Sequence, residues 1–221
     1  LASRSGLMPV GEGEHLRARG SALVTVHRCD VAQQAEARKL TAKMQHSLPP
    51  LSGVWHTAGV LADALLAKQD ASKLFRVHGA KAGGAETLHS VSAAAMLSSC
   101  VLFSSVAGLV GGAGQSNYAA ANALLDALAT CRKAQGCSAA SVAWGPWAEA
   151  GMASGGAISS RMSAMGLGLI DPWQGLAAMQ TAVHAGRPSV VAFWLVRWEV
   201  MLGPGKPAPA LLQGLAPRVT A

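Results

Sequence analysis

The sequence predicts an α/β protein built on a parallel sheet with helices on both faces. Apolar segments of strand length alternate with helical segments along most of the 221 residues, and this alternation is typical of a sheet whose strands are joined by crossover helices. Several strand segments are continuous apolar runs, as expected when both faces of a sheet are covered. Hydrophobic residues make up 51% of the chain and charged residues 13%, so a large core is expected.

The amino-terminal half is expected to hold three strands and three helices. Pro49 and Pro50 break the chain after the first of these helices. In order, we expect the end of a strand at residues 1–2, a turn at 3–6, a loop with room for a short helix at 7–20, a strand at 22–27, a helix at 33–46, a strand at 53–56, and helices near 70–78 and 82–97.

The carboxyl-terminal half continues the alternation. An Ala-rich helix is predicted to stop at Gly136, and the strand after it is predicted to stop at Gly145-Pro146. In order, we expect a buried strand at 100–104, a helix at 118–132, a strand at 139–144, a Gly/Ser/Met-rich segment at 151–169 that suits a mobile lid, a helix at 172–184, a strand at 190–195 and a linker-like tail after residue 203.

The residues that carry chemistry directly follow predicted strands. The carboxyl ends of parallel strands share one edge of a sheet, and ligands bind there. The sequence therefore predicts a single site at this edge. The residues concerned are Arg4, Asp30, Gly59, Ser105 and Pro146.

The charge of the chain favours some partners and disfavours others. The formal net charge is +7, but basic residues are spread along the chain and aromatic residues make up only 5% of it. This pattern disfavours nucleic-acid binding. A basic surface suits a phosphorylated cofactor or an acidic carrier protein.

The cysteines and the hydropathy indicate an intracellular, membrane-free protein. Cys29, Cys100, Cys131 and Cys137 show no paired spacing, so we expect buried free thiols and a cytoplasmic location rather than disulfides or a metal site. Residues 87–125 carry no charged side chain. Polar residues nevertheless interrupt this stretch, so it contains no apolar run long enough to span a membrane. No signal peptide is visible.

The candidate catalytic residues lie around Tyr118, the chain's only tyrosine. A phenol acts as a general acid near neutral pH when its pKa, usually about 10, is lowered. A nearby cation and a hydroxyl donor both favour the phenolate. Lys81 and Ser105 supply these groups, so we expect the pKa of Tyr118 to be lowered. Taken alone, a tyrosine at a helix start is more often a packing residue.

The segment Phe103-Ser104-Ser105 followed by Asn117-Tyr118-Ala-Ala-Ala-Asn122 resembles the ketoreductase domain of modular polyketide synthases, a branch of the short-chain dehydrogenase/reductase superfamily. Further matching segments are 3–6, 29–31, 56–60, Lys81 and 144–147. The resemblance implies a Rossmann-like fold. It also implies NADPH-dependent reduction of a β-ketoacyl thioester carried on an acyl carrier protein, among other synthase domains in the same polypeptide.

The resemblance implies catalytic roles for four residues. Ser105 would donate a hydrogen bond to the ketone oxygen, and Tyr118 would protonate it. The superfamily usually places a lysine four residues after the tyrosine, but Asn122 stands there and Lys81 lies upstream; this exchange is typical of the polyketide branch. Lys81 would lower the pKa of Tyr118 and hold the cofactor ribose, and Asn122 would orient Lys81 or a water.

The cofactor and substrate residues follow from the same resemblance. Arg4 stands where an NAD site would have an acidic residue, so a 2′-phosphate, and hence NADPH, is expected, with a solvated turn arginine as the alternative. Asp30 would bond the adenine amine, with a bare N-cap as its alternative. The implied cofactor residues are Ser3, Arg4, Asp30, Val31, Ala58, Gly59, Gly145 and Pro146, and the implied substrate residues are Asp63, Gln115 and Trp147.

Three further expectations concern neighbouring positions. His56 is expected to be structural. Asp63 is the one aspartate kept where many family members carry Leu-Asp-Asp, and Leu102 stands where the other stereochemical class carries tryptophan. Together these residues favour a D-hydroxyl product, although a solvated loop position would also explain Asp63.

One feature of the family is missing from the sequence. The Gly-rich turn that cradles a pyrophosphate after the first strand is not found, so we expect a sheet without its first strand, weak cofactor binding and low stability for the 221 residues alone. Residues 1–202 are expected to form a partial catalytic domain and 203–221 a tail. The alternative function is a non-catalytic structural lobe of a polyketide synthase.

Overall fold

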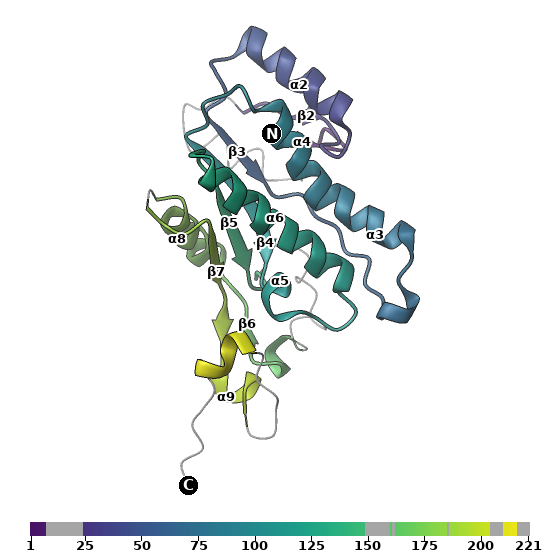
Figure 1. Cartoon of the computed structure of the whole chain (residues 1–221), viewed down its shortest axis with the longest axis vertical. Helices are drawn as coiled ribbons and strands as arrows, with labels where there is room; N and C mark the ends of the chain where they lie inside the picture. Colours follow the sequence, from purple (N-terminus) through teal and green to yellow (C-terminus); the bar gives the residue numbers. More distant parts are fainter. Residues whose placement is uncertain (8–23, 149–159, 161, 185, 204–209, 216–221) are drawn as a thin grey trace.

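The structure is a computed structural model that describes residues 1–7, 24–148, 160, 162–184, 186–203 and 210–215 (Figure 1). Its main sheet has four parallel strands in the order β3-β4-β5-β7. These strands are β3 (Gly53–His56), β4 (Ser99–Ser105), β5 (Ala140–Trp144) and β7 (Val190–Phe193). The predicted α/β class and the parallel sheet are confirmed.

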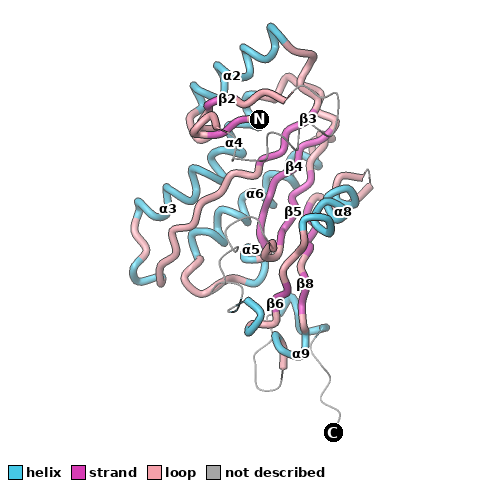
Figure 2. The backbone as a smooth tube through the Cα atoms, turned by 180° about the vertical axis from the view of Figure 1, so that it is seen from behind, coloured by secondary structure: helices cyan, strands magenta, loops and turns pink. Residues whose placement is uncertain are grey.

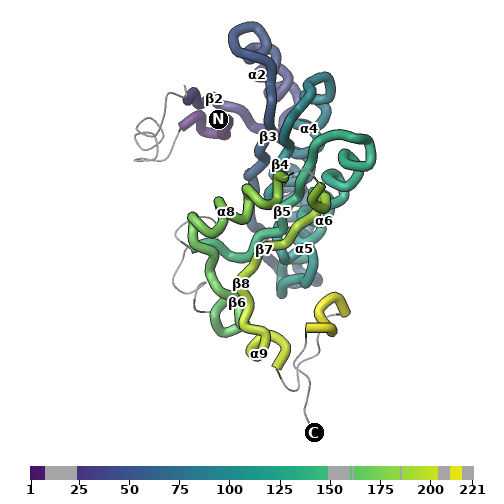
Figure 3. Tube along the Cα trace, turned by 90° about the vertical axis from the view of Figure 1, so that its left-hand side faces the viewer, coloured from purple at the N-terminus to yellow at the C-terminus, as the bar shows by residue number. Residues whose placement is uncertain are grey.

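Helices cover both faces of this sheet. The long α6 (Ser116–Ala134) packs on β4 and β5 from one side, and α8 (Pro172–Ala182) packs on β5 and β7 from the other (Figure 3). Alternate residues of a strand point to opposite faces. Leu102 therefore packs with Leu125 of α6, whereas its neighbour Val101 packs with Val142 and Trp144 on the α8 side.

The amino-terminal strands form a separate parallel pair. β1 (Ala2–Ser3) pairs with β2 (His27–Arg28) and not with β3. The strand predicted at 22–27 is therefore shifted toward the carboxyl end, because β2 pairs only along the length of the short β1. The Leu1 amine also donates a hydrogen bond to the Thr25 carbonyl, and the His27 amide donates one to the Leu1 carbonyl. Residues 8–23, which include most of the predicted 7–20 loop, lie outside the described residues.

Helix α2 (Gln34–Ser47) follows this pair, and a longer helical stretch follows β3. The two helices predicted near 70–78 and 82–97 are joined without a break through a π-helical turn (Figure 2). This stretch ends at Val91, earlier than predicted, where the Ser92 hydroxyl bonds the Leu88 carbonyl and competes with helix continuation. The parts are η1 (Leu66–Lys68), α3 (Ala71–His78), η2 (Gly79–Gly83) and α4 (Gly84–Val91).

The carboxyl-terminal part differs most from the sequence-based expectation. The strand predicted at 190–195 divides into β7 and β8 (Leu195–Val196), and β8 pairs antiparallel with β6 (Leu167–Gly168). Strands of two residues are too short to give a periodic signal. Most of the predicted lid lies outside the described residues. The last described elements are α9 (Trp198–Met201) and the 3-10 helix η3 (Ala210–Leu215), which buries Leu212.

Candidate functional site

The predicted catalytic residues meet at the carboxyl end of β4. Ser105 is the last residue of that strand, and its hydroxyl accepts a hydrogen bond of 3.2 Å from the Ala107 amide at the start of α5 (Ala107–Val110). Tyr118 lies in the first turn of α6 and is only 7% exposed. Its ring packs against Val77 and Ala121, so this candidate proton donor also has a packing role.

Lys81 reaches this place from a different element, the π-helical turn η2. Single π turns inside helices often occur at functional sites. The Lys81 side chain is 3% exposed, and its amine donates a hydrogen bond of 2.8 Å to the Phe103 carbonyl. The same amine lies 5.3 Å from the centre of the Tyr118 ring. The structure therefore places the cation beside the phenol, as the sequence predicted.

His56 and Gly84 fix the position of the π turn. The ring Nε2 of His56 is 2.8 Å from the Lys81 carbonyl, so this buried histidine anchors the backbone of Lys81. A Cβ atom at Gly84 would come within 3.0 Å of His56 and Val31, which explains why glycine stands there. Burial lowers the pKa of His56. The structural role expected for His56 agrees with this arrangement.

The charge of Lys81 is strongly affected by its surroundings. Burial lowers its pKa to about 8, because desolvation disfavours the ammonium form, while the negative charge of Asp126 acts in the opposite direction. With its pKa at about 8, the Lys81 amine remains mostly charged at neutral pH.

The expected lowering of the Tyr118 pKa is wrong for this structure. Burial of the phenol raises its pKa and outweighs the hydrogen-bonding interactions with Asn122 and Ser105, which lower it. The nearby Asp63 charge also raises it. Tyr118 therefore keeps its proton at neutral pH, which is the form that a proton donor requires.

Asn122 occupies the position one helical turn after Tyr118 and is completely buried. Its side-chain amide donates a hydrogen bond of 2.8 Å to the Tyr118 carbonyl, and its Oδ1 atom has no partner. Within the described residues no hydrogen bond joins Asn122 to Lys81. Within the described part of the chain, this buried Oδ1 is therefore an acceptor whose hydrogen bond is not made.

The candidate cofactor residues lie where parallel strands end, but several already have structural partners. The Ser3 hydroxyl accepts a hydrogen bond from the Gly6 amide, and one Asp30 oxygen accepts one from the Ala32 amide. A Cβ atom at Gly145 would lie 2.8 Å from Trp194, so close packing alone explains this glycine. The Pro146 carbonyl accepts a hydrogen bond from Ile170.

Other members of this group face the catalytic residues or solvent. A Cβ atom at Gly59 would lie 3.6 Å from the Lys81 amine, so the stretch after β3, with Ala58 and Gly59, runs beside Lys81. The Val31 side chain lies beside Gly84, directly after the π-helical turn that carries Lys81. Arg4 is exposed and makes no ion pair within the described part of the chain. This group thus includes an exposed guanidinium, that of Arg4, and it borders the buried ammonium of Lys81.

Two of the three candidate substrate residues are joined directly. The Gln115 amide donates a hydrogen bond of 3.1 Å to the Asp63 carboxylate. The Ala64 amide bonds the Gly114 carbonyl, and Asn117 bonds the Ala62 carbonyl. These contacts fasten the loop after β3 to the start of α6, next to Tyr118.

Trp147, the third candidate, lies elsewhere. It packs edge to face on Trp144, with ring centres 4.9 Å apart, within the cluster on the α8 face of the sheet. A Cβ atom at Gly175 of α8 would come within 2.0 Å of its ring. The structure therefore seats Trp147 in a packed cluster and does not bring it to Tyr118.

The sequence reasoning missed Asp126 and Ser141. Asp126 follows Tyr118 and Asn122 at the same spacing of four residues along α6, a pattern visible in the sequence. The Ser141 hydroxyl of β5 donates a hydrogen bond of 2.6 Å to its Oδ1 atom. Only the packing of α6 on β5 brings these two residues together.

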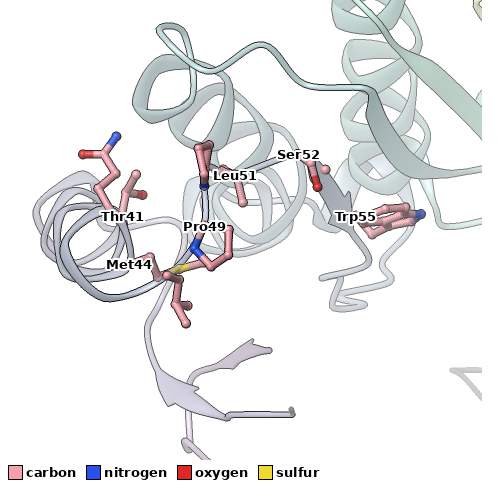
Figure 4. Close-up of a pocket in the computed structure, with 10 residues that line it drawn as sticks. Thr41, Met44, Pro49, Leu51, Ser52 and Trp55 are labelled. Atoms are coloured by element: carbon pink, nitrogen blue, oxygen red, sulfur yellow. The ribbon is translucent and has the colours of Figure 1, made fainter. Parts of the chain in front are cut away.

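A hollow of about 280 Å³ lies apart from this site, between α2 and β3 (Figure 4). Met44, Pro49, Leu51 and Trp55 are among its lining residues. It borders Gly53, at the amino end of β3, whereas Ser105 and the residues after β3 lie at carboxyl ends of strands. The hollow is therefore distinct from the candidate site.

Metal and disulfide chemistry find no support in the described residues. They contain no group of three or more His, Cys, Asp or Glu side chains placed to hold a metal ion. All four cysteines are free; Cys29 and Cys100 are buried as expected, but Cys131 and Cys137 are exposed. No described helix is both long and apolar enough to cross a membrane.

Comparisons with known proteins agree on one family. Residues 1–149 match the family model described as "KR domain". The chain is 40% identical over 230 residues to the polyketide synthase GfsE of Streptomyces halstedii, covering 100% of this chain and 6% of that protein. It is 41% identical to the spectinabilin polyketide synthase system protein NorB of Streptomyces orinoci, covering 98% of this chain and 10% of that protein.

Solved structures show the same relationship. The ketoreductase PlmKR1, from the first module of phoslactomycin biosynthesis in Streptomyces sp. HK803, superimposes with a TM-score of 0.87 at 35% identity, covering 95% of this chain and 49% of that one. An A-type ketoreductase from a modular polyketide synthase gives a TM-score of 0.82 at 36% identity, covering 91% and 43%. The chain thus spans less than half of these structures and a small part of the synthases.

Proposed function

The chain belongs to the KR domain family of polyketide synthase ketoreductases, and from this premise we propose that it uses NADPH to reduce a β-ketoacyl thioester carried on an acyl carrier protein. The observation that carries the proposal is the Lys81 amine 5.3 Å from the Tyr118 ring at the end of the strand that bears Ser105. A nicotinamide cofactor supplies hydride to the ketone carbon when it is bound.

Ser105 and Tyr118 act on the ketone oxygen. As negative charge develops there, a hydrogen bond from the Ser105 hydroxyl stabilises it, and a preorganised donor of this kind is worth on the order of 2.7–4 kcal/mol. Tyr118 then gives up its phenolic proton. An alkoxide is far more basic than a phenolate, so this transfer is favourable even though burial raises the pKa of Tyr118.

Lys81 stabilises the phenolate that remains after proton transfer. Its ammonium group is close to the Tyr118 ring and shielded from water, and charges interact more strongly in such surroundings than in bulk water. The unpaired Oδ1 of Asn122 is suited to hold a water that returns a proton to Tyr118. Lys81 thus acts on the product of the transfer rather than by acidifying the resting phenol.

The cofactor is held along the carboxyl edge of the strands. Arg4 pairs with a 2′-phosphate, and this selects NADPH over NADH. Its guanidinium is exposed and forms no ion pair with the described residues, which supports that role. Asp30, Val31, Ala58 and Gly59 line the adenosine end. Ser3, Gly145 and Pro146 complete the set, although their structural contacts already account for them in part.

The substrate passes over the loop that Gln115 and Asp63 fasten to α6. The net charge of +7 favours an acidic carrier protein as a partner. The large synthases among the relatives support other synthase domains as further partners. Trp147 is packed on the α8 face of the sheet and has no part in this proposal. The reaction forms the D-hydroxyl product, as expected from Asp63 and Leu102.

Turnover by the natural full-length protein tests this function. A β-ketoacyl N-acetylcysteamine thioester is offered with NADPH, and cofactor oxidation and hydroxy product are measured together. Reduction by the wild type that is lost in Tyr118→Phe supports the proposal. Absence of product in the wild type, with the cofactor still bound, would instead favour the non-catalytic structural lobe.

A further inference from the structure

The buried face of α6 continues beyond the catalytic residues to an acidic group. Tyr118, Asn122 and Asp126 follow one another at intervals of four residues, so they lie on one side of the helix. That side packs on β4 and β5. Lys81 approaches the same region from η2, which packs against α6.

Two buried hydroxyls of the sheet hold this face of α6 in place. The Ser104 hydroxyl of β4, 4% exposed, donates to the Asn122 carbonyl at 3.3 Å. The Ser141 hydroxyl of β5, 0% exposed, donates to the Asp126 Oδ1 atom at 2.6 Å. The Asp126 carboxylate is therefore held against β5, one helical turn after Asn122.

Lys81 is a buried cation without a direct ion pair in the described part of the chain. Its amine bonds only the Phe103 carbonyl and lies beside the Tyr118 ring. In the register of β4 and β5, Leu102 lies opposite Ser141 and Phe103 opposite Val142, so the hydroxyl that holds Asp126 lies on the strand next to the carbonyl that holds the Lys81 amine. An uncompensated buried charge is costly, and a fixed carboxylate nearby would reduce that cost.

The titratable groups around Lys81 are few. Among the described residues they are His56 from β3 and Tyr118 and Asp126 from α6, and the Asp63 carboxylate acts on the Tyr118 phenol. Burial favours the neutral form of His56 and of Tyr118. Burial also raises the pKa of Asp126, while hydrogen bonding to Ser141 and Ser104 and the charge of Lys81 lower it. Asp126 is the carboxylate of this set, and its charge and that of Lys81 favour each other.

We propose that Asp126 is a positioning residue that keeps Lys81 charged and directed toward Tyr118. It acts through Lys81 and does not touch the substrate. The inference rests on the proposed function for its kinetic consequence, but not for its effect on Lys81 itself. A purely structural role, as an acceptor for Ser141, would be served equally well by an uncharged amide.

Asp126→Asn separates these two roles, because the amide keeps an oxygen for Ser141 and loses the charge. The readout is the titration of Lys81 in the natural full-length protein, followed by NMR of lysine labelled with ¹³C at Cε and assigned with Lys81→Arg. We expect the midpoint to fall by about one unit, as for loss of a nearby opposite charge. Glu86→Gln, an exposed carboxylate on α4, is the matched control and should leave the midpoint unchanged.

The kinetic consequence follows from this shift. With a midpoint about one unit lower, roughly a tenth of Lys81 stays charged at pH 8 instead of about half. The kcat of Asp126→Asn should therefore fall about fivefold at pH 8 and less than twofold at pH 6, and Asp126→Glu should restore most of it. If the wild type reduces no thioester, the proposed function fails, while the NMR titration still decides the role of Asp126.

An unchanged Lys81 midpoint in Asp126→Asn, or an equal fall in Glu86→Gln, would overturn the proposal. If Asp126→Asn does not fold, the reciprocal experiment decides. Lys81→Met should then raise the midpoint of Asp126, measured with ¹³C-labelled aspartate, because the two charges stabilise each other. No change at Asp126 in that variant would also overturn the proposal.

Discussion

The Lys81 amine lies 5.3 Å from the centre of the Tyr118 ring, although the two residues come from different helices. The π-helical turn η2 makes this approach possible, because it directs Lys81 into the sheet edge rather than along the outside of the helix. Contacts within the chain therefore hold the cation beside the phenol. Such an arrangement reduces the cost of reorganising charges during a reaction.

Removing the phenolic hydroxyl should abolish most of the activity without unfolding the protein. Tyr118→Phe keeps the ring that packs on Val77 and Ala121 but loses the proton donor. General acids of this kind contribute about 10²–10⁴-fold, so kcat should fall by that factor. Steady-state kinetics measures the effect, and an unchanged thermal midpoint shows that packing is retained. A variant as active as the wild type would exclude Tyr118 from proton transfer.

Ser105→Ala should slow turnover by about 10²–10³-fold, as for loss of one donor to a developing oxyanion. Ser138→Ala is a suitable control, because it removes a hydroxyl that bonds the Ser98 carbonyl, before β5 begins. It should leave kcat unchanged. Equal losses in both variants would mean that the effect is structural rather than catalytic.

Activity should decline as the pH rises through about 8. The Lys81 pKa is lowered to about 8 by burial, so its charge is complete below pH 7 and lost above pH 9. The phenolate of Tyr118 then loses its stabilising cation. A plot of kcat against pH should show this basic limb, and Lys81→Arg, which stays charged, should move the limb to higher pH. A flat profile up to pH 9.5 would contradict this role.

Arg4→Ala should weaken NADPH binding and leave NADH binding nearly unchanged. Loss of a hydrogen-bonded charge contact costs roughly 1.5–3 kcal/mol, which corresponds to about a tenfold to hundredfold rise in Kd. Isothermal titration with both cofactors measures the ratio. Arg38→Ala, an exposed arginine on α2, is the control. Equal weakening for both cofactors would argue against recognition of the 2′-phosphate.

Gly175→Ala should destabilise the protein, even though alanine favours helices. The new Cβ would come within 2.0 Å of the Trp147 ring, which is held against Trp144 and has little room to move. Overpacking of this kind costs about 1–3 kcal/mol, more than the gain in helix propensity of about 1 kcal/mol. Urea denaturation measures the difference.

Gly214→Ala is the control for this prediction, because among the described residues no atom outside its own helix and chain neighbours lies within 4 Å of the added Cβ. Its free energy of unfolding should change little. If Gly175→Ala proves as stable as the wild type, the Trp147 ring is free to shift, and the packed cluster does not fix it.

Local sequence patterns were sufficient for the fold class and for most elements of the main sheet. The strand at 53–56 was predicted with the bounds that the structure has, and the strand at 100–104 within one residue at each end. Both are apolar runs with clear breaks beside them. The strand predicted at 22–27 was displaced, because a short strand takes its bounds from its partner rather than from its own residues.

The sequence predicted which residues of the candidate site lie close together better than it predicted their pKa shifts. Ser105, Tyr118, Lys81 and Asn122 were identified from the sequence, and the structure brings them together. The direction of the Tyr118 pKa was predicted wrongly, because burial by Val77 and its neighbours is a tertiary effect. Asp126 was overlooked, since its relation to Lys81 runs through space between two helices.

The sequence by itself determined that this protein is a parallel α/β domain with polar residues at its strand ends, because strand and helix periods and chain breaks are local properties. Only the tertiary structure decided that Lys81 enters beside Tyr118 through a π turn, that Trp147 belongs to the α8 cluster, and that Ser141 orients Asp126. These relations depend on which distant segments pack together. Burial and distance set the strength of each charge, and neither is encoded in a single stretch of chain.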